Sequence, residues 1–218
     1  RLLLIQLYSY YRRPPTRYHL PPEVIGQYCV MGAAFWNEGA CAVEYARIRE
    51  TGQRVAHLGI YEYYSNGAWP EVHRLFPHLI ADTVREYYEA GARYFATQPS
   101  TGFAVNGLNF FVLGRCLWNT RTDPDAVIDD FCRSGFGPAA DVIRSYLSAF
   151  AQRWRDTQSG EGATSGVDRH TGFARLYSKD FFARRQAELD AAEKIAAEQP
   201  DILQRLRFLQ AGLHHTRL

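Results

Sequence analysis

The sequence contains little methionine, no close cysteine pair and almost no net charge. Lys plus Arg number 25 against 23 Asp plus Glu among 218 residues, a formal net charge of +2. Charge alone therefore does not predict a nucleic-acid partner. No apolar run approaches the roughly 18 residues of a membrane span, so no membrane partner is expected. Neither a G-x-G-x-x-G fingerprint nor a Walker sequence is present, which argues against a nucleotide-binding sheet.

The cysteines predict neither a zinc site nor a disulfide framework. No C-x-x-C pair and no histidine at zinc-finger spacing accompanies them, and the histidines show no metal-ligand pattern. We therefore expect no metal and no cofactor. Three of the cysteines lie in apolar settings typical of small core residues, and spacing assigns no disulfide to any of them. The four are Cys29, Cys41, Cys116 and Cys132.

What the sequence does contain is aromatic side chains. Apolar residues make up 46% of the chain and charged residues 22%, as in an ordinary globular protein, yet 14% are aromatic, including 14 tyrosines. Two tyrosine groups, at 8–11 and 61–64, fall where the chain is expected to leave a strand. Amphipathic rings at strand ends suit flat, hydroxyl-rich ligands such as sugars. The alternative is that these rings pack beneath loops.

Hydrophobic patterning predicts a parallel sheet followed by helices. The third of four strand-like runs is followed by an amphipathic helix that begins near Pro77 and ends at Gly91, directly before the fourth run. Strand, helix and strand in this order make a βαβ unit, so the sheet is expected to be parallel. The strand-like runs are 2–8, 24–31, 54–61 and 93–97, and further helices are expected at 39–51, 106–118, 125–133, after 135–138, at 178–198 and from Pro200 onward.

Four parallel βα units correspond to half of a (β/α)8 barrel, which needs roughly 250 residues when complete. An open doubly wound sheet is the alternative, but its usual glycine fingerprint is missing. Because the chain also lacks an initiating methionine, we interpret it as a piece of a larger protein. The expected organisation is a partial barrel at 1–156, a Gly/Ser-rich linker at 157–172 and a helical hairpin at 173–218.

In parallel α/β folds the ligand lies at the carboxyl ends of the strands. Glu62 ends the third strand among aromatic residues, where burial would raise its pKa, and it is the strongest candidate for a catalytic carboxylate. A structural glutamate paired with Arg12, Arg93 or Arg115 is the alternative. Glu38 is a second catalytic candidate, although Asn37–Gly39 could simply be a polar turn that opens a helix.

Rings, amides and one arginine at the same strand ends are candidate substrate-binding residues. Paired carboxylates together with rings for stacking on pyranose faces are typical of a glycoside hydrolase. Arg12 could bind an acidic sugar through bidentate hydrogen bonds, with a solvated loop charge as the alternative. The candidates are Tyr10, Arg12, Trp36, Tyr63, Tyr64, Asn66, Trp69 and Gln98.

Three segments carry a resemblance to a known family: LGIYEYY at 58–64, the stretch 91–119 ending in LWN, and DPD at 123–125 followed by FGPAA at 136–140. Together they resemble an uncharacterised domain family of large, mostly secreted bacterial proteins. That family is related to α-glucuronidase-type glycoside hydrolases and is often described only as a domain of unknown function.

The resemblance implies the C-terminal half of a (β/α)8 TIM barrel, strands five to eight, followed by α-helical segments. Glu62 would then close the seventh strand, and the N-terminal half of the same barrel would supply the partner carboxylate. The implied function is hydrolysis of glycosidic bonds in an oligo- or polysaccharide, next to a uronic acid. The implied location is secreted or periplasmic, although the chain shows no signal peptide. Non-catalytic glycan binding and a purely structural half-barrel are the alternatives.

Overall fold

The computed structural model describes residues 1–13, 17, 19–30, 38–64, 72–98, 102–158 and 177–217. Its centre is a four-stranded sheet in the order β1-β2-β3-β4, and all three strand pairs are parallel. The four predicted strands are therefore confirmed, with ends that differ by up to three residues. The strands are β1 (Leu3–Leu7), β2 (Val24–Cys29), β3 (His57–Glu62) and β4 (Ala92–Thr97).

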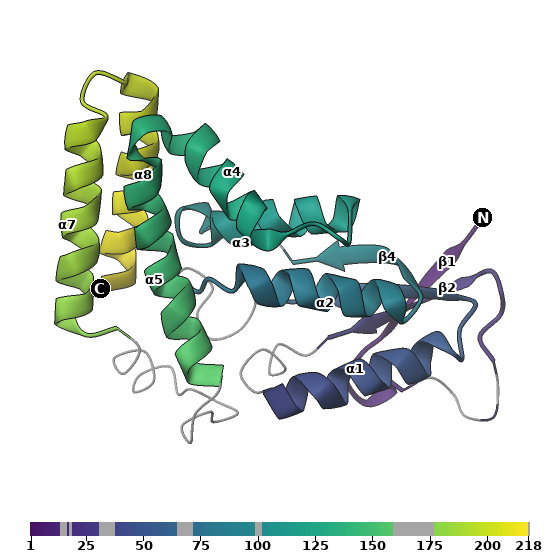
Figure 1. Cartoon of the computed structure of the whole chain (residues 1–218). Helices are drawn as coiled ribbons and strands as arrows, with labels where there is room; N and C mark the ends of the chain where they lie inside the picture. Colours follow the sequence, from purple (N-terminus) through teal and green to yellow (C-terminus); the bar gives the residue numbers. More distant parts are fainter. Residues whose placement is uncertain are drawn as a thin grey trace.

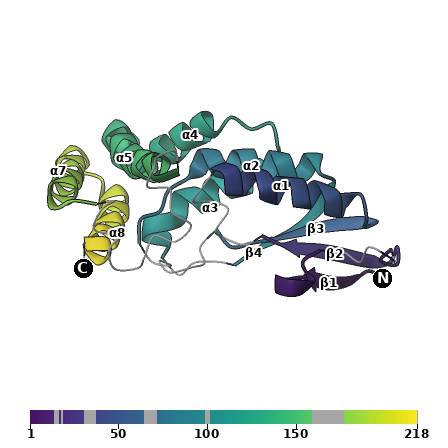
Figure 2. The ribbon, with the colours of Figure 1, turned by 90° about the horizontal axis from the view of Figure 1, so that it is seen from below.

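The described helices cover only one face of this sheet. Helix α1 (Glu38–Gly52) joins β2 to β3, and α2 (Pro77–Glu89) joins β3 to β4. In Figure 2 both helices lie on the same side of the strands, and no α-helix in the described part of the chain lies on the other side. A doubly wound sheet would carry helices on both faces. The arrangement is instead that of a partial α/β barrel followed by helices, as predicted.

The limits of α2 follow from its terminal residues. Pro77 occupies its first turn, where the missing backbone N–H costs no helical hydrogen bond. Gly91, directly after the helix, has a φ of 97°, a conformation that glycine adopts without strain. Ile80, Val84 and Tyr87 are buried on one side of the helix, against the sheet. The apolar side of α2 that the sequence spacing predicts therefore faces the core.

After β4 the chain is helical, as expected. In α3 (Phe103–Trp118) apolar residues are buried on several sides, and α4 (Pro124–Phe136) starts at the predicted cap, where Asp123 accepts from the Asp125 amide at 3.0 Å. A 3-10 turn, η3 (Gly137–Ala139), then redirects the chain into α5 (Ala140–Gln158). Gly137 makes this break with a φ of 48°.

The last two helices form the predicted hairpin. Ser178 caps α7 (Lys179–Ile195) by accepting from the Phe181 amide at 3.1 Å, and α8 (Pro200–Arg217) returns alongside it, at the end of the molecule away from the N-terminus (Figure 1). One hydrophobic cluster runs from the sheet into this hairpin and includes Leu206 and Leu213. The hairpin and the partial barrel therefore share a core. Most of the expected linker lies outside the described residues.

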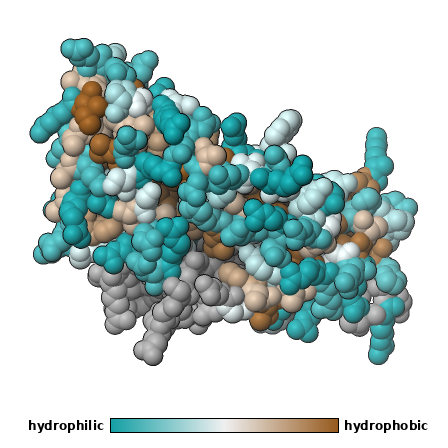
Figure 3. All heavy atoms as spheres, viewed as in Figure 1, coloured by the Kyte–Doolittle hydropathy of each residue, from teal (hydrophilic) through white to brown (hydrophobic). Residues whose placement is uncertain are grey.

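The side of the molecule that faces the reader in Figure 1 is formed by helices, and its surface is mostly hydrophilic (Figure 3). Strand β1 contrasts with it. Leu3 and Leu4 are 67% and 52% exposed at the edge of the sheet. Apolar side chains on an unpaired edge strand are normally covered by another strand or by a helix.

Candidate functional site

Glu62 is completely buried, and its side chain points into the helical layer. Along β3, Leu58, Ile60 and Glu62 face the helices, because successive side chains of a strand alternate between the two faces. The Glu62 Oε2 accepts from the Tyr87 hydroxyl of α2 at 2.5 Å, and Oε1 accepts from the Tyr63 amide at 2.8 Å. These are the partners of the carboxyl, in place of the arginine that a structural role was expected to provide.

Burial sets the protonation of this carboxyl. Loss of solvent raises the pKa of Glu62 to about 8, although the Tyr87 and Tyr63 hydrogen bonds oppose the rise. Glu62 is therefore mainly protonated at neutral pH. The pKa of Glu62 is thus raised as expected, because the helical layer excludes water from the carboxyl.

A second buried carboxylate, Glu44 of α1, was not predicted. Its Oε1 accepts from the Arg12 guanidinium at 2.6 Å and from the Tyr28 hydroxyl at 2.9 Å, and Arg47 donates to Oε2 at 3.3 Å. Arg12 lies over the Tyr28 ring, 5.5 Å from its centre. The i, i+3 spacing of Glu44 and Arg47 was the only signal in the sequence, and it is equally typical of an exposed helix. Arg12 is therefore a largely buried, paired charge, and not the solvated loop charge that was the alternative.

The opposite side of the sheet carries a tyrosine cluster. Tyr61 and Tyr63 alternate with Glu62 and so point away from the helices, with ring centres 4.9 Å apart. Tyr8, which follows β1, brings its ring to 6.5 Å from that of Tyr63. Burial raises the pKa of Tyr63 to about 12. We call this side of the sheet, with the three tyrosines at its carboxyl edge, the open face.

The other predicted binding residues divide between the two faces. Tyr64 lies in the helical layer, where its buried hydroxyl is 2.7 Å from that of Thr83. Tyr10 is 98% exposed in the 3-10 turn η1 (Ser9–Tyr11) at the end of β1. Gln98 is exposed after β4, and its backbone N–H donates to the Glu62 backbone carbonyl at 3.2 Å. Tyr63, Tyr10 and Gln98 are thus at the carboxyl ends as predicted, whereas Tyr64 is held inside the helical layer.

Several candidates cannot be placed. Trp36, Asn66 and Trp69 lie outside the described residues. Glu38 is the first residue of α1, and its side chain is likewise outside the described part.

The four cysteines are free thiols, and Cys29, Cys116 and Cys132 are buried, as their apolar settings predicted.

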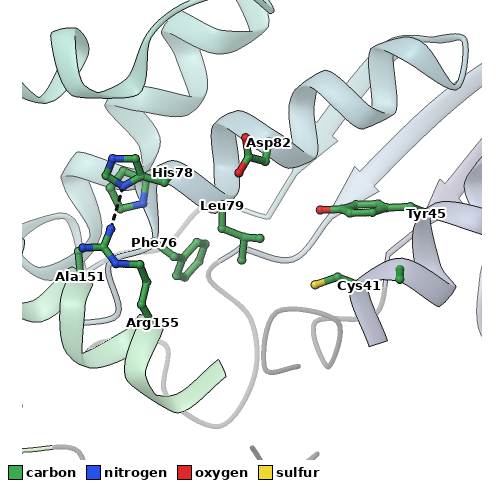
Figure 4. Close-up of a pocket in the computed structure, with 10 residues that line it drawn as sticks. Cys41, Tyr45, Phe76, His78, Leu79, Asp82, Ala151 and Arg155 are labelled. Atoms are coloured by element: carbon green, nitrogen blue, oxygen red, sulfur yellow. Dashed lines mark hydrogen bonds between the residues drawn. The ribbon is translucent and has the colours of Figure 1, made fainter. Parts of the chain in front are cut away.

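A cavity of about 400 Å³ lies between α1, α2 and α5 on the helical side (Figure 4). Tyr45 and Cys41 line one end, and Arg155 donates to the His78 ring at 3.2 Å at the other. Tyr45 also packs edge-on against Tyr87, with ring centres 6.3 Å apart. The tyrosine pair therefore separates this cavity from Glu62. Its walls are mainly apolar.

A buried polar cluster in the helical region surrounds His73. Its ring stacks on Phe150 at 4.0 Å, and its two nitrogens lie 2.8 Å from the hydroxyls of Thr216 and Tyr146. Burial lowers the pKa of His73 to about 3, so the ring is neutral. Because Thr216 is in α8 and His73 precedes α2, this cluster ties the end of the hairpin to the partial barrel.

Within the described ranges, no group of three or more His, Cys, Asp or Glu side chains could hold a metal ion. None of the described helices is both long and apolar enough to cross a bilayer.

The family comparison agrees with the fold. A family model described as a domain of unknown function (DUF4838) matches residues 3–148, about two thirds of the chain. The chain belongs to the DUF4838 family. Neither the curated proteins nor the solved structures gave a match. The DUF4838 match runs from β1 into α5, so it includes Glu44, Glu62 and the open face and ends before the α7–α8 hairpin.

Proposed function

We propose that this DUF4838 chain is part of a carbohydrate-active, glycoside hydrolase-like protein and contributes a sugar-binding surface to its barrel. The observation that carries the proposal is the open face, where the rings of Tyr8, Tyr61 and Tyr63 gather at the carboxyl edge of a parallel sheet. Ligands of such folds bind at that edge. Tyrosine rings combine an apolar face with a hydroxyl, which suits a pyranose ring.

The remainder of the barrel would come from its N-terminal half in the parent protein. Exposed Leu3 and Leu4 and the unpaired edge of β1 support this part of the proposal, because a neighbouring strand would cover both. The same half would supply a carboxylate for acid/base chemistry. A parent of this kind is proposed to act as a secreted or periplasmic enzyme on an oligo- or polysaccharide.

Within this chain Glu62 is proposed to act in one of two ways. As a general acid it would donate its proton to the leaving sugar oxygen, and its raised pKa supports that role. A group without exposed surface can contact substrate only after the helical layer moves. As a positioning residue, Glu62 would instead hold the Tyr63 amide, and with it the ring on the open face.

Non-catalytic glycan binding is the second candidate function, and the complete burial of Glu62 favours it. In that case the tyrosines bind sugar and no bond is cleaved. Sugar release and sugar binding must therefore be measured separately.

The deciding experiment uses the full-length protein with uronic-acid-containing and neutral oligosaccharides. Glu62→Gln is nearly isosteric with the protonated acid and should leave the fold intact. Glu86→Gln is the matched control, because Glu86 is a partly exposed carboxylate of α2 that pairs with Arg49 at 2.6 Å. If only Glu62→Gln abolishes release, Glu62 is essential for hydrolysis. If Glu62→Gln still releases sugar, the catalytic residues lie in the other half of the barrel. If the unmodified protein binds sugar but releases none, non-catalytic glycan binding is the function.

A further inference from the structure

The outward side of α3 is apolar. At 3.6 residues per turn, one side of this helix consists of Phe103, Gly107, Phe110, Gly114, Leu117 and Trp118. Trp118 is 93% exposed, Phe103 54% and Leu117 42%. The rings of Phe103 and Phe110 stack along this side, with centres 6.0 Å apart. Since a surface helix normally presents polar side chains to water, this composition indicates that a partner covers the outward side of α3.

The described neighbours of α3 pack on its other sides. No atom outside its own stretch of helix lies within 4 Å of the position that a Cβ atom on Gly114 would occupy. Arg115 is directed to α4, where it pairs with Asp130 at 3.4 Å. Asn109 lies on the opposite side of the helix, where its side chain accepts from the Phe76 amide at 3.0 Å, just before α2. The space above Gly114 is therefore open.

The outward side of α3 adjoins a free edge of the sheet. In the described part of the chain β4 is the last strand and pairs only with β3, so its other edge has no strand partner. A hollow of about 330 Å³ between α2, β4 and α3 has Leu117 on one wall and Tyr94 and Phe95 on another. These residues lie in the described ranges 72–98 and 102–158. An unpaired strand edge beside an exposed apolar helix requires a partner that covers both.

One kind of partner meets both requirements, a strand followed by a helix. A strand alone would pair with β4 and leave α3 exposed, whereas a helix alone would leave the backbone groups of β4 unpaired. A second copy of the chain offers the edge of β1, yet the described residues between β1 and β2 contain the turn η1 and no α-helix. By contrast, β2 and β3 are each followed by a helix on the same face of the sheet (Figure 2). The surface beside β4 fits one more unit of that strand–helix kind.

We propose that the free edge of β4 and the outward side of α3 bind a strand–helix unit from the N-terminal half of the barrel. Its strand lies parallel to β4, and its helix packs over Gly114 and Leu117. That helix is apolar where it meets α3, because a charge buried there would lose water without gaining a partner. This inference rests on the part of the proposed function in which the N-terminal half completes the barrel. It deepens that proposal by placing a second junction at the edge opposite β1.

Hydroxyl-radical footprinting tests whether the outward side of α3 is covered. The 218-residue chain and the full-length protein are oxidised in parallel, and the modified residues are identified by mass spectrometry. Trp118 and Phe103 should react at least about fivefold more slowly in the full-length protein, because the core of an interface excludes water. Phe208 of α8 is the matched control, since it is 52% exposed against 54% for Phe103 and should react equally in both proteins.

Two glycine variants test the contact by packing. Gly114→Leu places a large side chain in the interface, and Gly135→Leu is the control in α4, where a Cβ atom would likewise meet nothing within 4 Å. In the 218-residue chain both should raise the Tm by about 1 to 4 °C, since leucine has the higher helix propensity. In the full-length protein Gly114→Leu should lower the Tm by about 3 °C or more through overpacking, whereas Gly135→Leu should not lower it.

Equal oxidation of Trp118 in the two proteins would overturn the inference, and so would a Gly114→Leu full-length protein as stable as its Gly135→Leu counterpart. Protection of Trp118 that increases with the concentration of the shorter chain would overturn it too, because the partner would then be a second copy. Sugar binding is measured on the same full-length samples. A covered α3 in a protein that binds no sugar refutes the carbohydrate function alone, and an exposed α3 in a protein that binds sugar refutes the inference alone.

Discussion

The Oε2 atom of Glu62 lies 2.5 Å from the hydroxyl oxygen of Tyr87, with no part of the glutamate exposed to solvent. The pair joins the end of β3 to α2 and separates two surfaces. The cavity bordered by Tyr45 is on the helical side, and the tyrosines of the open face are on the other. Glu62, which the sequence predicts as a catalytic carboxylate, is thus buried between the sheet and its helices.

Glu62 should make the chain less stable as the pH rises. Its pKa is about 8 in the folded chain against an ordinary value of 4.5, so the folded state holds a proton that the unfolded state loses. The stabilisation is complete below about pH 4.5 and is lost progressively up to about pH 8, in total roughly 3 to 6 kcal/mol. Urea unfolding of Glu62→Gln between pH 4 and pH 9 should lack this decline. An unchanged slope in the variant would contradict the assignment.

His73 should act in the opposite direction. Its pKa of about 3 lies below the ordinary 6.5, so the unfolded state gains a proton first as the pH falls. The stability it contributes is complete above about pH 6.5 and lost towards pH 3, with about 2 kcal/mol lost by pH 5. His73→Phe, which keeps a ring against Phe150, should remove this loss, as unfolding at pH 5 and pH 7 can show.

In the unmodified chain the pH dependences of the two groups should nearly cancel between about pH 5 and pH 6.5. As the pH rises through this window, the stability contributed by Glu62 falls while that contributed by His73 increases. Each variant then exposes the slope of the remaining group. A strong pH dependence of the unmodified chain in this window, unaffected by either substitution, would count against both assignments.

Neighbouring tyrosines should respond very differently to truncation. Tyr64→Ala removes a buried ring and leaves Thr83 without its tyrosine partner, so it should cost roughly 3 to 5 kcal/mol of unfolding free energy. Tyr63→Ala removes a half-buried ring from the open face and should cost about 1 kcal/mol or less. Chemical denaturation of the two variants in parallel measures the difference. Equal costs would mean that the open face is covered in the folded protein.

The hairpin and the partial barrel should unfold together. Thr216→Val removes the hydroxyl that pairs with the buried His73 ring and should cost about 1 to 3 kcal/mol. Thr122→Val, at a partly exposed loop residue, is the control and should stay within about 0.5 kcal/mol. Circular dichroism and tryptophan fluorescence should report a single coincident transition. Two separated transitions would show that α7 and α8 form an independent unit.

Local sequence accounts for much of the fold. The four strands, the start of α2 at Pro77, the Asp123 and Ser178 caps and the break at Gly137 all depend on neighbouring residues and on backbone preferences that are legible in the chain. Glu62 at the end of β3, and the presence of Tyr10, Tyr63 and Gln98 at the carboxyl ends, were predicted in the same way. Strand alternation also separates Tyr63 from Tyr64, but the sequence does not say which face the helices cover.

That choice of face, and with it the environment of each charge, depends on tertiary packing. Glu44, Arg12 and Tyr28 are far apart in the chain, and only the docking of α1 on the sheet brings them together. The same holds for His73 and Thr216, which are 143 residues apart. Propensity and periodicity report on contacts within about a turn of helix or a pair of strand residues. Burial, pKa and partner choice are set by contacts between distant segments, and these made Glu62 neutral, withdrew Arg12 and left the tyrosines on an open face.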